Sequence, residues 1–459
     1  MKIIKHGKRN GKQRYLDKET GKTFTGEVYP KTYVVTSAQN KTPVSEPFLA
    51  SLRAFPGELI VLPFRYKNPT SVFADLSEDE WYIDVCHETV DLNDNISVIG
   101  DVSIQPTAVR PLSGMDSYNR NKSCIFGHPR RELRMVPSSA GKLPKLLTTT
   151  GTITVPNYTD SKAGKKAEFH GVIGAAVVTV TSEKEFFVRH ITANDDGSFY
   201  DLNKKYHPDG TVTTEDISAL VLGDYHAGHT CPLAKKASLE MIDELNPEYA
   251  VFHDVLDFSS RNHHHKNDFI LQARKHKAGN ECVKSELQFV CSELDEFGDK
   301  TKVVVVRSNH DCALDRWVRE ADPKKDPINL EMWCKSTLAA LEGKSLLKYW
   351  YHELSDNHTH KFLERDERFM INGVDISEHG DLGVNGARGS AVSLAKTCRK
   401  KIIGHSHSPC IVDGIFQVGT LTKLRLEYNL GASSWMNANA VIYPDGHRSL
   451  LFIVNGNWR

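Results

Sequence analysis

The sequence predicts an α/β protein whose C-terminal half is a layered domain of strands and helices. Three apolar runs pass directly into polar residues: "ISALVLGDYH" (217–226), "EYAVFHDVLDF" (248–258) and "VVVVRSNHDCALDRW" (303–317). Helical segments separate them at 233–245 and at 282–297, where apolar residues recur on one helical face. Strands that alternate with helices indicate a parallel sheet, whose chemistry lies just past the carboxyl ends of its strands.

A polar, turn-rich segment at 192–216 separates this half from the rest of the chain. Because 459 residues exceed one ordinary core, we expect two domains with a boundary near residue 215. Residues 1–215 would form an accessory domain, and residues 216–459 the catalytic domain. The segment 32–69 has the pattern strand, helix, strand, so the accessory domain is expected to be α/β or α+β.

The composition is that of a globular protein with balanced charge. Lysine and arginine number 58, as do aspartate and glutamate, so total charge favours no particular partner. The nine cysteines form no CxxC pair, which favours a reducing cytoplasm over a disulfide framework. We expect no signal peptide and no membrane span, because no stretch is apolar enough. The oligomeric state stays open, with a homo-oligomer among the alternatives.

Five apolar runs end in residues that bind metals or move protons. The ends are "GDYH" (223–226), "HDVLD" (253–257), "SNHD" (308–311), "EHGD" (378–381) and "GHSH" (404–407). Carboxylate, amide and imidazole ligands together favour manganese as the cation, with iron, zinc and magnesium as alternatives, over calcium. The candidate ligands are Asp224, His226, Asp254, Asn309, His379, His405 and His407. Seven ligands exceed the needs of one ion and suit two divalent ions that share a bridging carboxylate.

In order and composition, these blocks resemble the calcineurin-like metallophosphoesterase superfamily, which includes nucleases of the SbcD type. The family order is D-x-H, G-D-x-x-D, G-N-H-D, a later histidine and G-H-x-H. The resemblance implies a β-sandwich flanked by helices and a two-metal site. It assigns Asp224, His226 and His407 to the first metal, Asn309, His379 and His405 to the second, and Asp254 to the bridge. It also implies that His310 is the catalytic histidine, with Asp311 as its orienting partner and Asp257 in support.

Two positions depart from the family pattern. His253 stands where the family has glycine before the bridging aspartate, and Ser308 replaces the glycine before Asn309. Those glycines let the backbone turn closely under the metals, so the departures put the loop geometry in doubt rather than the ligands. His379 is the least secure ligand, because three other histidines precede it. The competitors are His352, His358 and His360.

Three basic segments favour a nucleic-acid substrate. They are the arm at 1–22, the loop "RNKSCIFGHPRRELR" (120–134) and "DSKAGKKAEFH" (160–170). A frayed terminus and solvated loops are the alternative explanation of these segments. The candidate substrate contacts are Lys5, Lys8, Arg9, Arg130, Arg131, Lys165 and Lys166.

The segments 34–44 and 148–170 resemble parts of tailed-phage proteins of the T5 type that degrade host DNA. The first hypothesis is therefore a manganese-dependent DNase that acts in the cytoplasm, the host cytoplasm if a phage encodes it. A phosphatase or cyclic-nucleotide phosphodiesterase is the first alternative, because fold and metal site do not choose the substrate. The second is a non-enzymatic scaffold that binds nucleic acid and keeps the metal for structure.

Overall fold

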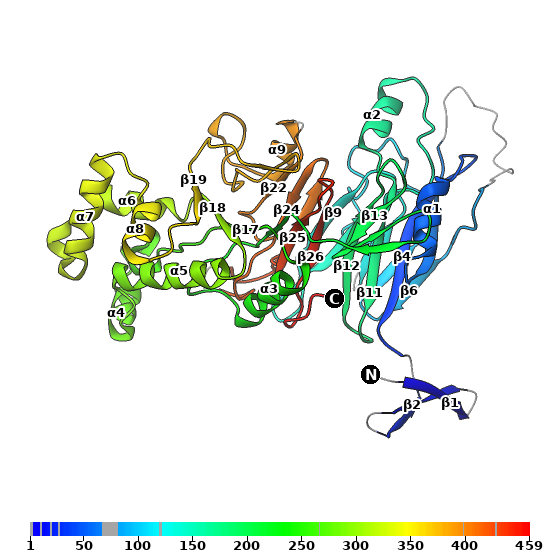
Figure 1. Ribbon diagram of the computed structural model, residues 1–459, viewed down its shortest axis with the longest axis horizontal. Helices are drawn as coiled ribbons and strands as arrows, with labels where there is room; N and C mark the ends of the chain where they lie inside the picture. The colour runs from blue at the N-terminus through cyan, green and yellow to red at the C-terminus, as the bar shows by residue number, and fades with distance from the viewer. Residues whose placement is uncertain are drawn as a thin grey trace.

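A computed structural model of the protein describes residues 3–9, 12–18, 21–25, 28–66, 81–118, 122–265, 267–397, 399–426 and 429–459. The molecule is elongated: α4 to α8 gather at one end, and the sheets, with α1 and α2 beside them, fill the other (Figure 1). The predicted α/β class is confirmed by this mixture of helices and sheets. No helix among these residues is both long and apolar enough to cross a membrane.

A six-stranded sheet carries the apolar runs that the sequence analysis singled out. Its first four strands in spatial order are parallel, and the last two form an antiparallel hairpin. In spatial order the strands are β19 (Lys361–Leu363), β18 (Lys302–Val306), β17 (Tyr249–His253), β16 (Ala219–Val221), β25 (Ala438–Ile442) and β26 (Arg448–Phe452). The runs at 217–226, 248–258 and 303–317 therefore each contain one parallel strand, as expected.

Side chains alternate between the two faces of this sheet, and each face has its own core. Leu220 and Phe252 face a cluster that includes Met241 and Leu294 from the covering helices. Val221 faces a second cluster, which we call the inter-sheet core, together with apolar residues of the other large sheets. Helices therefore cover one face of the sheet while further strands cover the opposite face.

The helices of this half follow the predicted segments. Those predicted at 233–245 and 282–297 are α3 (Pro232–Leu245) and α5 (Val283–Gly298). The others are α4 (Phe269–Ala278), α6 (Cys312–Glu320), α7 (Leu330–Leu341), α8 (Leu346–Leu354) and α9 (Ala391–Leu394). Short 3₁₀ turns are η1 (Ser259–Arg261), η2 (His263–His265), η3 (Pro323–Lys325), η4 (Pro327–Asn329), η5 (Val384–Gly386) and η6 (Ala395–Thr397).

A ten-stranded sheet joins strands from both sides of residue 215. Ile411 in β23 pairs with Leu133 in β9, so residues far apart in the sequence are neighbours in this sheet. Because one sheet contains strands from both sides of residue 215, the division of the chain into two domains at that residue stays a prediction. In spatial order the strands are β20 (Met370–Ile371), β21 (Val374–Asp375), β22 (Lys401–Ile403), β24 (Ile415–Gln417), β23 (Cys410–Val412), β9 (Glu132–Val136), β10 (Lys145–Thr149), β8 (Ser123–Phe126), β7 (Ile96–Ile99) and β6 (Thr89–Asn93).

The rest of the N-terminal half contributes a four-stranded sheet and two small ones. The strand–helix–strand pattern at 32–69 is confirmed as β4 (Lys31–Gln39), α1 (Glu46–Arg53) and β5 (Glu58–Phe64). With β11 (Gly174–Val180) and β12 (Phe186–Thr192), these strands form a sheet in the order β12, β11, β4, β5. The small sheets are β1 (Ile3–Arg9), β2 (Lys12–Asp17) and β3 (Thr23–Thr25), and β13 (Phe199–Asp201), β14 (Lys204–Tyr206) and β15 (Val212–Thr214).

Candidate metal centre

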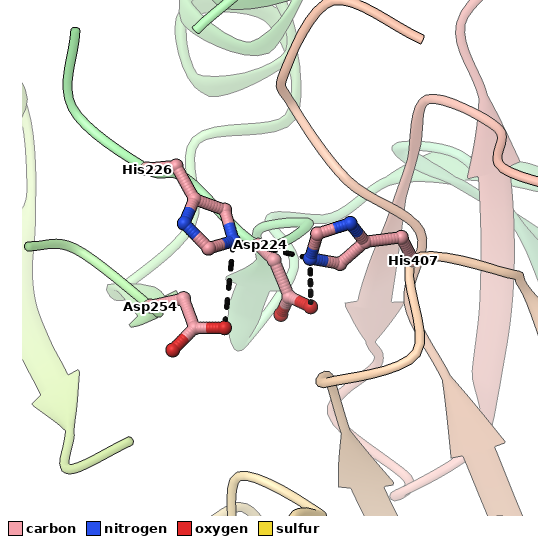
Figure 2. Close-up of side chains that lie close together, drawn as sticks. All are labelled: Asp224, His226, Asp254 and His407. Carbon is pink, nitrogen blue, oxygen red and sulfur yellow. Dashed lines mark hydrogen bonds and ion pairs between the residues drawn. The ribbon is translucent and has the colours of Figure 1, made fainter. Parts of the chain in front are cut away.

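Four predicted ligands meet where strands of two sheets end. Asp224 and His226 follow β16 and Asp254 follows β17 of the six-stranded sheet, whereas His407 follows β22 of the ten-stranded sheet. One ligand atom from each lies within 4.8 Å of the others, and all four side chains are buried (Figure 2). Because β16 and β17 are parallel neighbours, their carboxyl ends lie at one edge of their sheet, and the loop after β22 brings His407 to the same place.

The ligand atoms are close enough to surround a cation. His226 Nε2 lies 3.0 Å from His407 Nε2 and 3.5 Å from Asp254 Oδ2, while His407 Nε2 lies 3.2 Å from Asp224 Oδ2 (Figure 2). Three of these residues, His226, Asp254 and His407, have left-handed backbones, with φ of 45°, 48° and 60°. Such backbones are uncommon outside glycine and concentrate at functional sites, where the surrounding structure holds them.

His379 joins this cluster from the loop after β21. Its Nε2 lies 3.1 Å from Asp254 Oδ2, its Nδ1 lies 4.0 Å from Asp224 Oδ1, and the ring is fully buried. The competing histidines lie elsewhere: His352 and His358 pair with each other through their Nδ1 atoms, 2.7 Å apart. His360 packs on the Tyr351 ring with its Nε2 3.2 Å from a backbone oxygen of α5. The geometry therefore favours His379.

Two predicted ligands of the second metal are less buried than the others. The centroid of the His405 ring is 5.3 Å from that of His379, and His405 is only partly buried. Asn309 is exposed, in the turn between β18 and α6. Five of the seven predicted ligands thus form the buried cluster, and His405 adjoins it at His379.

Several polar atoms of the cluster lack a hydrogen-bond partner, and they indicate whether the cluster could hold a metal ion. Both Asp224 oxygens, Asp254 Oδ1, both His379 nitrogens and His407 Nδ1 are buried without a hydrogen-bond partner. Buried polar groups in native proteins are almost always partnered, and a carboxylate without a partner is costly. Carboxylate oxygen with imidazole nitrogen suits a first-row divalent ion. The residues therefore fit a metal, whose identity and number the geometry does not set.

Burial and neighbouring charges oppose each other at the two carboxylates. Burial raises the pKa of the Asp224 carboxyl well above its usual value. At Asp254, burial also favours the neutral form, but His379, His310 and His226 outweigh it and hold the pKa well below the usual value. Carboxyl groups whose pKa is shifted far from the usual value, and which pack among histidines, are typical of functional sites.

Asp257 organises the histidines on the open side of the cluster. Its Oδ1 lies 3.1 Å from His226 Nδ1 and 3.4 Å from His310 Nδ1, and its Oδ2 lies 3.4 Å from His229 Nε2. Burial lowers the pKa of His310, but Asp254 and Asp257 outweigh this and raise it to about 9. The His310 side chain remains 30% exposed, so its ring can meet a substrate.

Asp311 has a different position from the one expected. Its Oδ1 accepts the backbone N–H of Leu256 at 3.0 Å, and its Oδ2 accepts the N–H and hydroxyl of Ser308 at 3.0 and 2.8 Å. The carboxylate thus ties the loops after β17 and β18 together. Because Asp257 is the carboxylate beside His310 Nδ1, Asp257 rather than Asp311 fits the role of orienting partner.

The positions that depart from the family pattern lie behind the cluster. His253 is fully buried, and its ring centroid is 5.5 Å from that of His379. Burial, with the charge of His379, lowers the pKa of His253 to about 3, so this ring is neutral. The close approach occurs instead at Gly404, where an added Cβ would collide with Asp224 Oδ1. The "GHSH" block contained this glycine, but the sequence showed no reason for it.

The predicted substrate contacts divide into three groups. The side chains of Lys5, Lys8 and Arg9 lie outside the described part of the structure. Lys165 and Lys166 are exposed, on a helix, α2 (Lys162–His170), where a loop was expected. Arg130 and Arg131 are 6% and 7% exposed, so the prediction that they follow a phosphate backbone at the surface is wrong for this structure. They point inward because β9, which they precede, lies in the middle of the ten-stranded sheet.

A pocket of about 570 Å³ opens beside the cluster at His379. Gly380, Asp381, Arg365 and Arg399 are among the residues that line it. Arg365 donates to both Asp381 oxygens, at 2.7 and 2.8 Å, which holds this wall in place. Of the candidate ligands, His379 is the one that lines this pocket.

The fold and the site define an α/β protein with a buried histidine–aspartate cluster that could hold a metal ion. The sequence is 32% identical to Protein A1 of Escherichia phage T5, in an alignment that covers 93% of this chain and 83% of that protein. The chain therefore belongs to the family of that phage protein, which confirms the resemblance to a tailed-phage protein. No protein-family model matches the sequence, so membership of the metallophosphoesterase superfamily stays a prediction.

Proposed function

We propose that this protein is a metal-dependent phosphodiesterase and that its substrate is DNA. The observation that carries the proposal is the convergence of Asp224, His226, Asp254, His379 and His407, with His310 at the open edge. The centroid of the His310 ring lies 4.6 Å from that of His226, so a candidate proton donor adjoins the candidate metal ligands. This combination suits cleavage of a phosphoester.

Each side chain has a role that follows from its position. Asp224, His226 and His407 would hold one divalent ion, and Asp254 lies where it can bridge to a second, held by His379 with Asn309 and His405. We propose manganese as the activating ion. Divalent ions bound there would supply a metal-activated hydroxide near neutral pH and offset the charge of the phosphoryl oxygens.

His310 would protonate the leaving oxygen. Its Nδ1 faces Asp257, which leaves Nε2 as the atom that meets the substrate. A pKa near 9 keeps the imidazole protonated at neutral pH, as a general acid requires. Asp257 fixes the ring orientation, and the fully buried His253 packs near His379, where it helps to exclude water.

The preference for DNA rests on the family and on the basic segments. The sequence resemblance to T5-type phage proteins that degrade host DNA stands beside the 32% identity to Protein A1 of Escherichia phage T5. Lys165 and Lys166 on α2 are exposed and available to phosphates. Action in the host cytoplasm follows if a phage encodes the chain.

One assay separates the nuclease from its alternatives. Metal-stripped protein is reloaded with manganese and incubated with plasmid DNA, linear DNA, bis(p-nitrophenyl) phosphate and p-nitrophenyl phosphate. Cleavage of DNA and of the diester, lost in Asp254→Asn, is the expected result. Turnover of the monoester with intact DNA would favour a phosphatase. Metal binding without turnover of any substrate would favour the scaffold and overturn the proposal.

A further inference from the structure

Two arginines and a histidine enter the protein interior where the large sheets meet. Arg131 directly precedes β9 of the ten-stranded sheet, His190 lies in β12 of the four-stranded sheet, and Arg448 begins β26 of the six-stranded sheet. They are 7%, 2% and 8% exposed. Burial of two guanidinium groups is unusual, because arginine keeps its charge.

Strand alternation places all three on the same side. Side chains two residues apart share a face of a strand. Leu133, Val188 and Leu450 lie two residues from Arg131, His190 and Arg448, respectively, and all three belong to the inter-sheet core. The side chains of Arg131, His190 and Arg448 therefore point toward this core.

Hydrogen bonds hold the three residues beside one another. Arg131 Nη2 donates to the carbonyl of Ile191 at 2.9 Å, next to His190 in the chain. The backbone N–H of His190 donates to Ser449 Oγ at 3.0 Å, next to Arg448. Their charges also interact: burial lowers the pKa of Arg448 to about 9 and that of His190 well below its usual value, and the Arg131 charge adds to both shifts.

The two guanidinium groups have N–H donors to spare, and one ring nitrogen of His190 lacks a partner. Arg131 Nε, Arg448 Nε and His190 Nδ1 are buried without a hydrogen-bond partner. The other contacts of the guanidinium groups are neutral. Arg448 Nη1 donates to the carbonyls of Lys401 and Gly414, at 2.9 and 2.7 Å, and its guanidinium lies 4.4 Å from the Phe416 ring centroid. Among the described residues, no carboxylate pairs with Arg131 or Arg448 within ion-pair distance.

A neighbouring arginine shows how the same protein neutralises a buried guanidinium. Arg189 lies in β12 beside His190 and is 8% exposed. Its Nη2 donates to Asp201 Oδ2 at 2.7 Å, in a two-pronged ion pair. Arg131 and Arg448 are buried to the same extent without such an acid. A water molecule could satisfy their free N–H groups, but it would leave two positive charges in a low-dielectric interior.

We propose that a small inorganic anion binds at the junction of the three sheets, between Arg131, Arg448 and His190. The anion accepts the free N–H groups and supplies the missing negative charge. The two guanidiniums are its charged partners, while the neutral His190 imidazole, whose Nε2 donates to the Thr149 carbonyl at 3.2 Å, lines the junction without donating to the anion. Because Arg131 and Arg448 come from different sheets, the bound anion links the ten-stranded sheet to the six-stranded sheet.

Thermal unfolding in chloride and in gluconate at equal ionic strength tests the site. Gluconate is too large for a closed interior, so the wild-type melting temperature should rise by several degrees as chloride replaces it, and the rise should saturate. Arg131→Met and Arg448→Met should each abolish the chloride dependence. Arg189→Met is the matched control: it removes an equally buried arginine that has its own acid, and it should keep the dependence.

Diffraction from crystals grown with bromide provides a direct readout on the unaltered chain. An anomalous peak between Arg131 and Arg448 is expected. Equal melting temperatures of the wild type in the two salts, or a chloride dependence that survives both Met substitutions, would overturn the proposal. If either Met variant fails to fold, the wild-type titration and the bromide map still decide the question, and a map without a peak at the junction refutes the site.

Discussion

The Nε2 atoms of His226 and His407 lie 3.0 Å apart at the centre of the buried cluster. Each also faces a carboxylate oxygen, of Asp254 for His226 and of Asp224 for His407. Two imidazoles cannot both donate a proton along the same line, so at most one of these nitrogens is an N–H donor to the other. The arrangement of two lone-pair donors with two carboxylates is that of ligands around a shared cation.

Loading with metal should stabilise the folded protein. Manganese binds the assembled cluster but not the unfolded chain in this geometry, so at 100 times its dissociation constant it should add about 2.7 kcal/mol to the free energy of unfolding. Calorimetric melting with and without manganese measures this. Asp254→Asn should lose most of the gain. An identical melting temperature in chelator and in manganese would contradict a metal centre here.

Removal of the His310 imidazole should affect turnover but not metal binding. His310→Ala is expected to lower kcat on DNA by about 10² to 10⁴-fold, the usual range for a lost general acid. Bound manganese, measured by elemental analysis, should stay at the wild-type level. His276→Ala is the control, because His276 is an exposed histidine on α4 that pairs with Glu281, away from the cluster. Unchanged kcat in His310→Ala would end the general-acid assignment.

Substitution of Asp257 and of Asp311 should have separable effects. Asp257→Asn removes the charge that orients His226 and His310, so we expect about 10 to 100-fold lower turnover. Asp311→Asn weakens the bonds to Leu256 and Ser308 and should lower the free energy of unfolding by about 1–3 kcal/mol. Steady-state kinetics and urea titration of both variants check this. Greater loss of turnover in Asp311→Asn would restore Asp311 as the orienting residue.

The stability of the fold should fall as the pH drops below 6.5. Burial lowers the pKa of His128 to about 4, so between these values the unfolded chain binds a proton that the folded chain excludes. His128 alone should therefore cost about 2 kcal/mol at pH 5 relative to neutral pH, with no further loss below pH 4. Urea titrations at pH 7 and pH 5 measure the difference. His128→Asn should show a smaller difference than the wild type; an equal one would refute the role of His128.

Removal of the first small sheet should weaken DNA binding alone. Strands β1, β2 and β3 pair only with one another within the described chain, so deletion of residues 1–27 leaves the other sheets intact. We expect a several-fold rise in the dissociation constant for DNA and a shallower salt dependence, because fewer phosphates are neutralised. Fluorescence anisotropy at several salt concentrations gives both values. Diester turnover provides the control, and unchanged DNA affinity would remove the arm from the substrate site.

The α/β class, the parallel strands β16, β17 and β18, the helices α3 and α5, and the candidate metal ligands could all be predicted from the sequence alone. The apolar runs that lead to Asp224, Asp254 and His407 could be recognised in the sequence, because a buried strand and the polar residues after it are adjacent in the chain. For the same reason the spans of α3 and α5 could be predicted from periodicity alone. The helix α2, which contains the basic segment "KKAEFH", was not predicted, because its short buried face holds little beyond Gly164 and Ala167.

Which side chains meet depends on the folded molecule. The pairing of β9 with β23 buries Arg130 and Arg131, although their sequence is that of a basic loop. The choice of Asp257 over Asp311 beside His310 depends on how the loop after β17 lies against the turn after β18. These are contacts between segments distant in the chain. Local periodicity reports which face of a strand is buried but not which partner covers it, so the pairing of sheets must come from the folded molecule.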